Sequence, residues 1–344
     1  MISLFKTITR LLSSPRSTNK RKIQLLYKSL FKFHPSPLCK PALALLCCPV
    51  SVASKNLPVT QVSEWDVEEN IGHLMTLARI ALERGEVEKA EAILEMGIKI
   101  CEEYQSYMIM PYMYDILASI AFATGNLRRA EILLVNVIEK MVQLGTPESD
   151  SLLVDFKLRL TRIYSVHNED TLAEIGFKNC LDLQKSKILD GDTSTRTGML
   201  YVNCLFWYGL HKIKCSDYNS AKHLIDSAYS FSMKVKGLSP YQEMVILGTL
   251  AELNTQLGDY DIALQNIYSA ILLGKGIGSL DLPKFYLKLG KIYIKLGADS
   301  TAEQWLNEAR TLAELFDDKE VIEEINSILK PTTSQRSFFG FNKN

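Results

Sequence analysis

The chain has 344 residues, 47% of them hydrophobic, and carries 39 basic and 39 acidic residues. This length allows one or two domains or one extended array. The balanced charge conceals a division, because no Asp or Glu precedes Glu64 whereas ten basic residues do, so the chain from Glu64 onward has 29 basic and 39 acidic residues. An acidic body excludes nucleic acid as the main partner, since contacts to phosphate supply most of that affinity.

The acid-free segment at the start is rich in Ser and Thr, which is typical of a mitochondrial transit peptide. Residues 1–14 place apolar side chains on one helical face and Lys6 and Arg10 off it, and residues 19–33 repeat the pattern. We expect residues 1–62 to be a transit peptide and linker, with a disordered basic tail as the alternative.

An apolar run at residues 42–50 follows within the same segment. A membrane-spanning helix needs about 20 apolar residues. The run is therefore too short to span a membrane by itself, and it is interpreted either as the second part of an import signal or as a linker.

The acidic part of the chain repeats one spacing six times. Each copy has a large apolar residue, a small residue next to it, a turn residue seven positions later and an alanine five positions after the turn. In "YMYDILASIAFATGNLRRAEILL", residues 112–134, these are Leu117, Ala118, Gly125 and Ala130. The six turn residues are Gly85, Gly125, Asn168, Ser216, Gly258 and Gly297, and the six alanines are Ala90, Ala130, Ala173, Ala221, Ala263 and Ala302.

The spacing predicts pairs of antiparallel helices. The small residue and the alanine let two helices approach closely, and the large residues fill the space beside the crossing. A glycine at the turn accepts a positive φ without steric cost. Asn168 is the next most suitable residue at such a turn, and Ser216 is less suitable.

This pattern resembles the tetratricopeptide repeat over residues 66–315. It departs from the standard repeat because no copy begins with Trp or ends with Pro, and the turn residues lie 39 to 48 positions apart instead of about 34. The widest gap contains residues 186–198, which we interpret as an exposed loop. The resemblance implies an all-α, tetratricopeptide-like helical solenoid of about six helix pairs over residues 63–330.

Helix-capping signals accompany the repeats. Ser239 with Gln242 predicts a capping box, and Asp317 with Glu320 predicts another, at the start of a final helix. A final helix with one polar side is the cap that a stacked array needs for solubility. We expect the tail, residues 331–344, to be disordered.

The motifs that carry chemistry are absent from the sequence. The stretch "GKGIG" at residues 274–278 lacks the strand and the G-K-[ST] of a phosphate loop, so we interpret it as a linker. No His–Cys pair has a known zinc-motif spacing and no G-x-S-x-G occurs. We therefore predict no catalytic, cofactor or metal site, and we interpret four cysteines as structural. These are Cys101, Cys180, Cys204 and Cys215.

The predicted binding surface is the concave face formed by the first helices of the repeats. In tetratricopeptide repeats, the side chains on this face come from the residues two before, two after and five after the large apolar residue of each copy. The resulting surface has mixed charge and aromatic residues, which favours an extended or helical protein segment as the ligand; packing against neighbouring helices is the alternative for each position. The candidate residues are Arg79, Asp115, Phe122, Arg162, Phe206, Leu210, Glu252 and Lys291.

Two longer stretches, "YDILASIAFATGNLRRAE" and "LRLTRIYSVHNEDTLAEIGFKNCLD", resemble a mitochondrial branch of the tetratricopeptide repeat family. That resemblance implies a non-enzymatic protein, peripherally associated with the inner mitochondrial membrane, that binds respiratory complex III. It also implies a role in the assembly and maintenance of the complex, through clearance of fragments of its Rieske iron–sulfur subunit.

Three other interpretations stay open. One is a cytosolic cargo adaptor similar to the kinesin light chain, against which the acid-free first segment argues. Another is a mitochondrial scaffold of a different complex. The last is a protease-like activity of the chain itself, against which the absence of a nucleophile motif argues.

Overall fold

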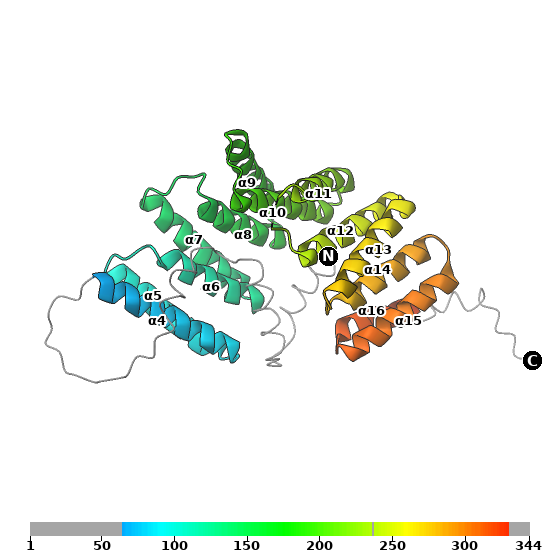
Figure 1. Ribbon diagram of the computed structural model, residues 1–344, viewed down its shortest axis with the longest axis horizontal. Helices are drawn as coiled ribbons and strands as arrows, with labels where there is room; N and C mark the ends of the chain where they lie inside the picture. Colours follow the sequence, from blue (N-terminus) through cyan, green and yellow to red (C-terminus); the bar gives the residue numbers. More distant parts are fainter. Residues whose placement is uncertain (1–63, 236, 330–344) are drawn as a thin grey trace, which may run out of the picture. The chain divides into compact units, whose positions relative to one another are not determined.

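The computed structural model describes residues 64–235 and 237–329; the predicted transit peptide and C-terminal tail lie outside these residues. Within the described part, thirteen α-helices follow one another and no strand occurs. Consecutive helices pair through short turns, and a single helix ends the series (Figure 1). The predicted all-α fold of about six helix pairs with a final capping helix is confirmed.

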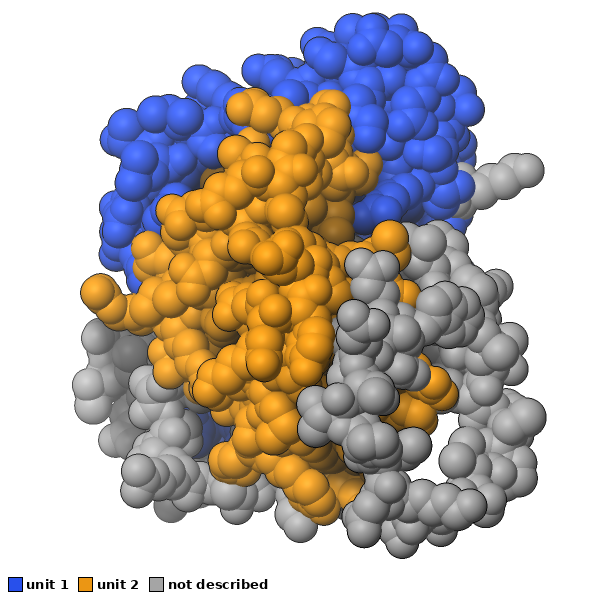
Figure 2. Space-filling view, turned by 90° about the vertical axis from the view of Figure 1, so that its left-hand side faces the viewer, with its two compact units in different colours: residues 1–2, 164–344 blue, residues 3–163 orange. Residues whose placement is uncertain are grey.

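The helices fall into two compact units, divided between Ile163 and Tyr164 within one helix (Figure 2). Unit 2 contains α4 (Glu64–Glu83), α5 (Val87–Glu103), α6 (Met110–Ala123), α7 (Leu127–Gln143) and most of α8 (Ser151–Val166). Unit 1 contains α9 (Asp170–Leu189), α10 (Thr195–Lys214), α11 (Tyr218–Ser232), α12 (Pro240–Leu257), α13 (Tyr260–Gly276), α14 (Leu282–Lys295), α15 (Asp299–Leu315) and α16 (Lys319–Leu329).

The turn inside every helix pair contains one residue in the left-handed region. The six residues that the repeat pattern aligns there have φ between 61° and 86°, including the two that are not glycine, Asn168 and Ser216. At Gly125, the amide donates to the carbonyl of Phe122, and the next amide donates to the carbonyl of Ala121. These bonds satisfy carbonyls that the helix end leaves without an intrahelical partner.

The helices of each pair cross at the small residues that the pattern specifies. All six alanines after the turn are at most 1% exposed, and the large residue four positions further along is also buried in every copy. The small residue of the first helix is buried at Ala78, Ala118, Thr161, Gly209, Ala251 and Gly290. Because the two helices are so close, only small side chains fit where they cross.

Enlarging one of these alanines is expected to separate a helix pair. Ala263→Leu adds three carbons to a fully buried position on α13, and overpacking of this kind costs about 1–3 kcal/mol. Urea unfolding followed by circular dichroism measures the change. The exposed neighbour Ile262 provides the control, because Ile262→Leu is expected to alter the free energy of unfolding by less than about 0.5 kcal/mol. Equal effects at the two positions would contradict the close crossing.

The two predicted capping boxes have different outcomes. Ser239 accepts a hydrogen bond from the amide of Gln242 at the start of α12, and the return bond of the box is also present, which confirms the first. The second capping box is wrong, because Val321, three positions after the capping residue Asp318, has no side chain that could return the bond. Asp318, not Asp317, accepts from the amide of Val321, because Asp317 has a φ of 54° and belongs to the preceding turn.

The last helix covers the end of the hydrophobic core of unit 1. Val321 and Ile325 on α16 are buried and belong to the same cluster as Leu306 and Ala309 on α15. This packing is the capping role predicted for a final helix. Within the described residues, no helix combines the length and the apolar character needed to cross a membrane.

Candidate functional site

In unit 2, the predicted surface residues lie on the first helices α4, α6 and α8. Arg79 on α4 is exposed, whereas Asp115, Phe122 and Arg162 are half-buried. The latter three take part in contacts between α6 and α8. Of these four candidates, Arg79 thus presents the most side chain to a partner.

An ion pair and a cation–π contact join α6 to α8. The guanidinium of Arg159 pairs with the carboxylate of Asp115 and also donates to Ser119 Oγ at 3.2 Å. One turn further along, the guanidinium carbon of Arg162 lies 5.3 Å from the centre of the Phe122 ring. Burial, followed by the charge of Arg159, lowers the pKa of Arg162, although a guanidinium stays charged at neutral pH.

In unit 1, two of the predicted surface residues are buried. Phe206 and Leu210 on α10 are 8% and 5% exposed. The ring of Phe206 packs edge-on against that of Trp207, with the centroids 6.0 Å apart. These two side chains therefore offer little area to a partner.

The two charged candidates of unit 1 form ion pairs between successive first helices. Glu252 on α12 lies 3.2 Å from Lys288 Nζ on α14. Lys291 on α14 lies 2.6 Å from Glu324 on α16, the helix that takes the next position in the series. The Lys291–Glu324 pair is exposed and contributes about 0–1 kcal/mol, whereas the side chains of Glu252 and Lys288 are largely buried.

Sequence reasoning missed Arg159 and Lys288, which complete two of these pairs. Both residues immediately precede the large apolar residue of their copy, Leu160 and Leu289. The sequence signal for these pairs is an acidic residue on the first helix of one copy and a basic residue just before the large apolar residue of the next copy. The first helices of each unit thus carry both signs of charge, which suits a ligand that itself carries mixed charge.

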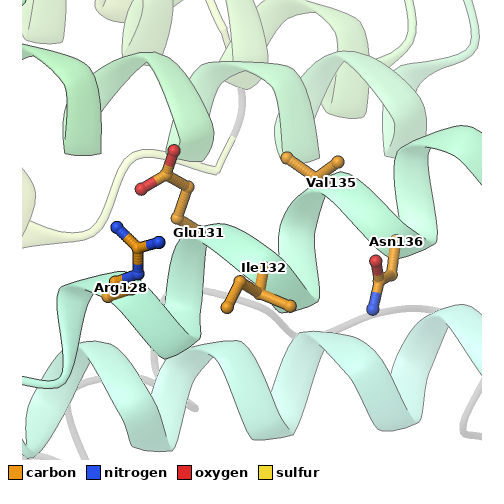
Figure 3. A pocket seen from close by; sticks show the side chains of 5 residues that line it. All are labelled: Arg128, Glu131, Ile132, Val135 and Asn136. Carbon is orange, nitrogen blue, oxygen red and sulfur yellow. The ribbon is translucent and has the colours of Figure 1, made fainter.

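A separate hollow lies on α7. Its lining comes from that single helix, and Figure 3 shows the side chains of Arg128 and Glu131 close together on it, with the partly exposed Ile132 beside them. A ligand pocket is ordinarily concave and encloses most of its ligand. The hollow lacks that form, and none of the predicted surface residues lines it. Its five lining residues are Arg128, Glu131, Ile132, Val135 and Asn136.

Among the described residues, one group of three side chains brings potential metal-ligand atoms within 4.8 Å of one another. It consists of Asp170, His211 and Cys215, from α9 and the end of α10. Cys215 is exposed, whereas Cys101, Cys180 and Cys204 are buried.

Serial helix pairs, left-handed turns and buried small residues at the crossings define a tetratricopeptide-like helical-repeat protein. Solved structures agree with this fold. A Rap protein complexed with Competence and Sporulation Factor has a TM-score of 0.59 at 14% identity, covering 89% of this chain and 80% of its own. The apo form of the quorum sensor NprR from B. thuringiensis has a TM-score of 0.59 at 12% identity, covering 94% and 85%.

Among curated proteins, the chain is similar to Tetratricopeptide repeat protein 19, mitochondrial. The mouse (Mus musculus) protein is 24% identical over 297 residues, which are 84% of this chain and 80% of the relative. The human (Homo sapiens) protein is 22% identical over 274 residues, which are 77% and 72%. The Drosophila melanogaster homologue is 21% identical over 259 residues, which are 75% and 70%. No family model matches the chain. The fold and these relatives support a protein-binding repeat scaffold.

Proposed function

We infer that the protein is a non-enzymatic scaffold of mitochondria that binds respiratory complex III and promotes the clearance of Rieske subunit fragments. The observation that carries this inference is the similarity to mitochondrial tetratricopeptide repeat protein 19 over 75–84% of the chain, in mouse, human and fly. The acid-free, basic first segment supports import into mitochondria.

Charged side chains on the first helices support a binding role for the chain. The first helices carry ordered side chains of both charges, held by pairs such as Asp115–Arg159 and Glu252–Lys288. Surfaces arranged before binding lose less conformational entropy when a ligand docks. In this proposal the chain holds a complex III segment or a Rieske fragment on these helices, sits peripherally at the inner membrane through that contact, and leaves proteolysis to a separate enzyme.

Loss of the protein is expected to make Rieske fragments accumulate in mitochondria and to lower complex III activity. Immunoblots of the Rieske subunit in cells without the protein measure the first effect, and re-expression of the natural chain is expected to reverse it. Unchanged fragment levels would contradict the proposal. Cleavage of a Rieske peptide by the purified chain alone would contradict the non-enzymatic part of it.

Re-expression of surface variants tests which helices bind. Arg79→Glu reverses an exposed charge on the first helix α4, and we expect it to restore fragment clearance poorly, because Arg79 belongs to the predicted partner surface and arginines are frequent at interface hot spots. Arg128→Glu makes the same change on the exposed side of the second helix α7, and we expect it to restore clearance fully. The opposite ranking would place the binding surface on the second helices.

A further inference from the structure

We propose that Asp170, His211 and Cys215 form a binding site for a divalent transition-metal ion, Zn²⁺ foremost, that joins the start of α9 to the end of α10. One ligand atom from each of the three side chains lies within 4.8 Å of the other two. This site is independent of complex III binding, since none of the three belongs to the predicted partner surface.

The separation between the ligand atoms of His211 and Cys215 suits a tetrahedral ion. His211 Nε2 lies 3.7 Å from Cys215 Sγ. Around a tetrahedral Zn²⁺ with bonds of about 2.0 Å to nitrogen and about 2.3 Å to sulfur, the two ligand atoms lie roughly 3.5 Å apart. The small difference means that an ion can enter between them with little movement of either side chain.

The local backbone explains why the two side chains meet. His211 lies in the last turn of α10 and Cys215 caps that helix, so the two are four positions apart and share a face. Ser216, which follows, has a φ of 61° and turns the chain away into α11. Asp170 is the first residue of α9, which packs against α10. The ligands thus come from two helices, and a bound ion would hold α9 against α10.

The imidazole of His211 is held in a suitable orientation. Its Nδ1 lies 2.9 Å from Ser165 Oγ, and the ring packs 5.4 Å from the ring of Phe177. A serine hydroxyl can accept the proton of Nδ1, and in that tautomer Nε2 has the lone pair that a metal requires. Metal-binding histidines ordinarily have such a hydrogen bond on the other ring nitrogen, which fixes the ring.

Two neighbouring side chains, Lys214 and Glu174, lie beside the proposed ligands. Lys214 Nζ lies 2.7 Å from Asp170 Oδ1, and a carboxylate has a second oxygen that can bind the ion while this contact persists. Glu174 Oε2 lies 3.9 Å from His211 Nε2 and is held by Lys212 at 3.0 Å. An ion bound by the three protein ligands would need one water to complete a tetrahedral shell. Thiolate, imidazole and carboxylate together select Zn²⁺ over Mg²⁺ or Ca²⁺, which prefer oxygen ligands alone.

Titration of the full chain with Co²⁺, followed by competition with Zn²⁺, tests the site. Cys39, Cys47 and Cys48 are replaced by serine so that Cys215 is the exposed thiol under test. We expect one Co²⁺ per chain, with thiolate-to-cobalt charge-transfer absorption and the intense visible bands of tetrahedral cobalt, both abolished by Zn²⁺. Binding of the ion is expected to release the thiol proton of Cys215 to solvent. Absence of thiolate absorption would overturn the proposal.

Matched variants locate the ion. Cys215→Ser is expected to remove the charge-transfer absorption, and Asp170→Asn to weaken binding by at least about tenfold. Asp299→Asn is the control, because Asp299 is also the exposed first residue of a helix two positions after a turn, yet belongs to no such group among the described residues. All three positions are exposed, so circular dichroism is expected to be unchanged. Equal affinity in Asp170→Asn and Asp299→Asn would overturn the assignment.

Discussion

Phe177→Ala is expected to lower the free energy of unfolding by about 3–5 kcal/mol, the range for removing a large buried aromatic side chain. Phe177 on α9 is 1% exposed and occupies the large position that follows the crossing alanine Ala173. Its ring stacks on that of Tyr208 on α10 at a centroid distance of 5.6 Å and an interplanar angle of 14°. The substitution therefore removes both buried area and a ring contact between consecutive pairs.

The same helix provides the control for this prediction. Ile175, two positions before Phe177, is 60% exposed, so Ile175→Ala is expected to change the free energy of unfolding by less than about 0.5 kcal/mol. Urea unfolding monitored by circular dichroism, with both variants measured side by side, gives the comparison. Similar midpoints for the two variants would contradict the placement of Phe177 in the core.

Gly290→Val is expected to cost about 1–3 kcal/mol by overpacking. Gly290 is the small residue of the last crossing, and a Cβ atom added there would lie 2.7 Å from Leu306 Cδ2 and 2.8 Å from its Cγ. Leu306 is itself fully buried on α15, so it has little space into which to move. The substitution is therefore expected to push α14 and α15 apart.

Gly276 at the end of α13 is the matched position, because a Cβ added there meets no atom within 4 Å. Gly276→Val is expected to leave the free energy of unfolding within about 0.5 kcal/mol of the natural protein, since valine is a slightly better helix former than glycine. Thermal unfolding of the two variants measures the difference. A destabilisation at Gly276 as large as that at Gly290 would contradict the close crossing as the cause of the cost.

The sequence was sufficient to predict the fold because the repeat is a local pattern. A turn residue, a small residue and an alanine at set offsets specify one helix pair, and the buried Ala130 and Ala263 illustrate how little distant context that requires. The capping box at Ser239 is local in the same way. The error at Asp317 arose because only Asp317 has a glutamate three positions later, whereas the turn geometry makes Asp318 the capping residue.

The candidate site was less predictable because it depends on which residues of different helices meet. Asp115 and Glu252 were identified from their positions, but their partners Arg159 and Lys288 lie about 40 residues away. Position alone also assigned Phe206 to the surface, whereas it is buried. The four-residue spacing of His211 and Cys215 is visible in the sequence, but the approach of Asp170 from another helix is not.

Affinity purification of the tagged full chain from detergent-solubilised mitochondria, with identification of the co-purifying proteins, tests the proposed function most directly. We predict core subunits of complex III and the Rieske subunit in the eluate, with lower yields for Arg79→Glu than for Arg128→Glu. A mitochondrial eluate without complex III subunits would contradict the proposed partner. Recovery of the chain in the cytosol with microtubule motors would contradict the mitochondrial assignment as well.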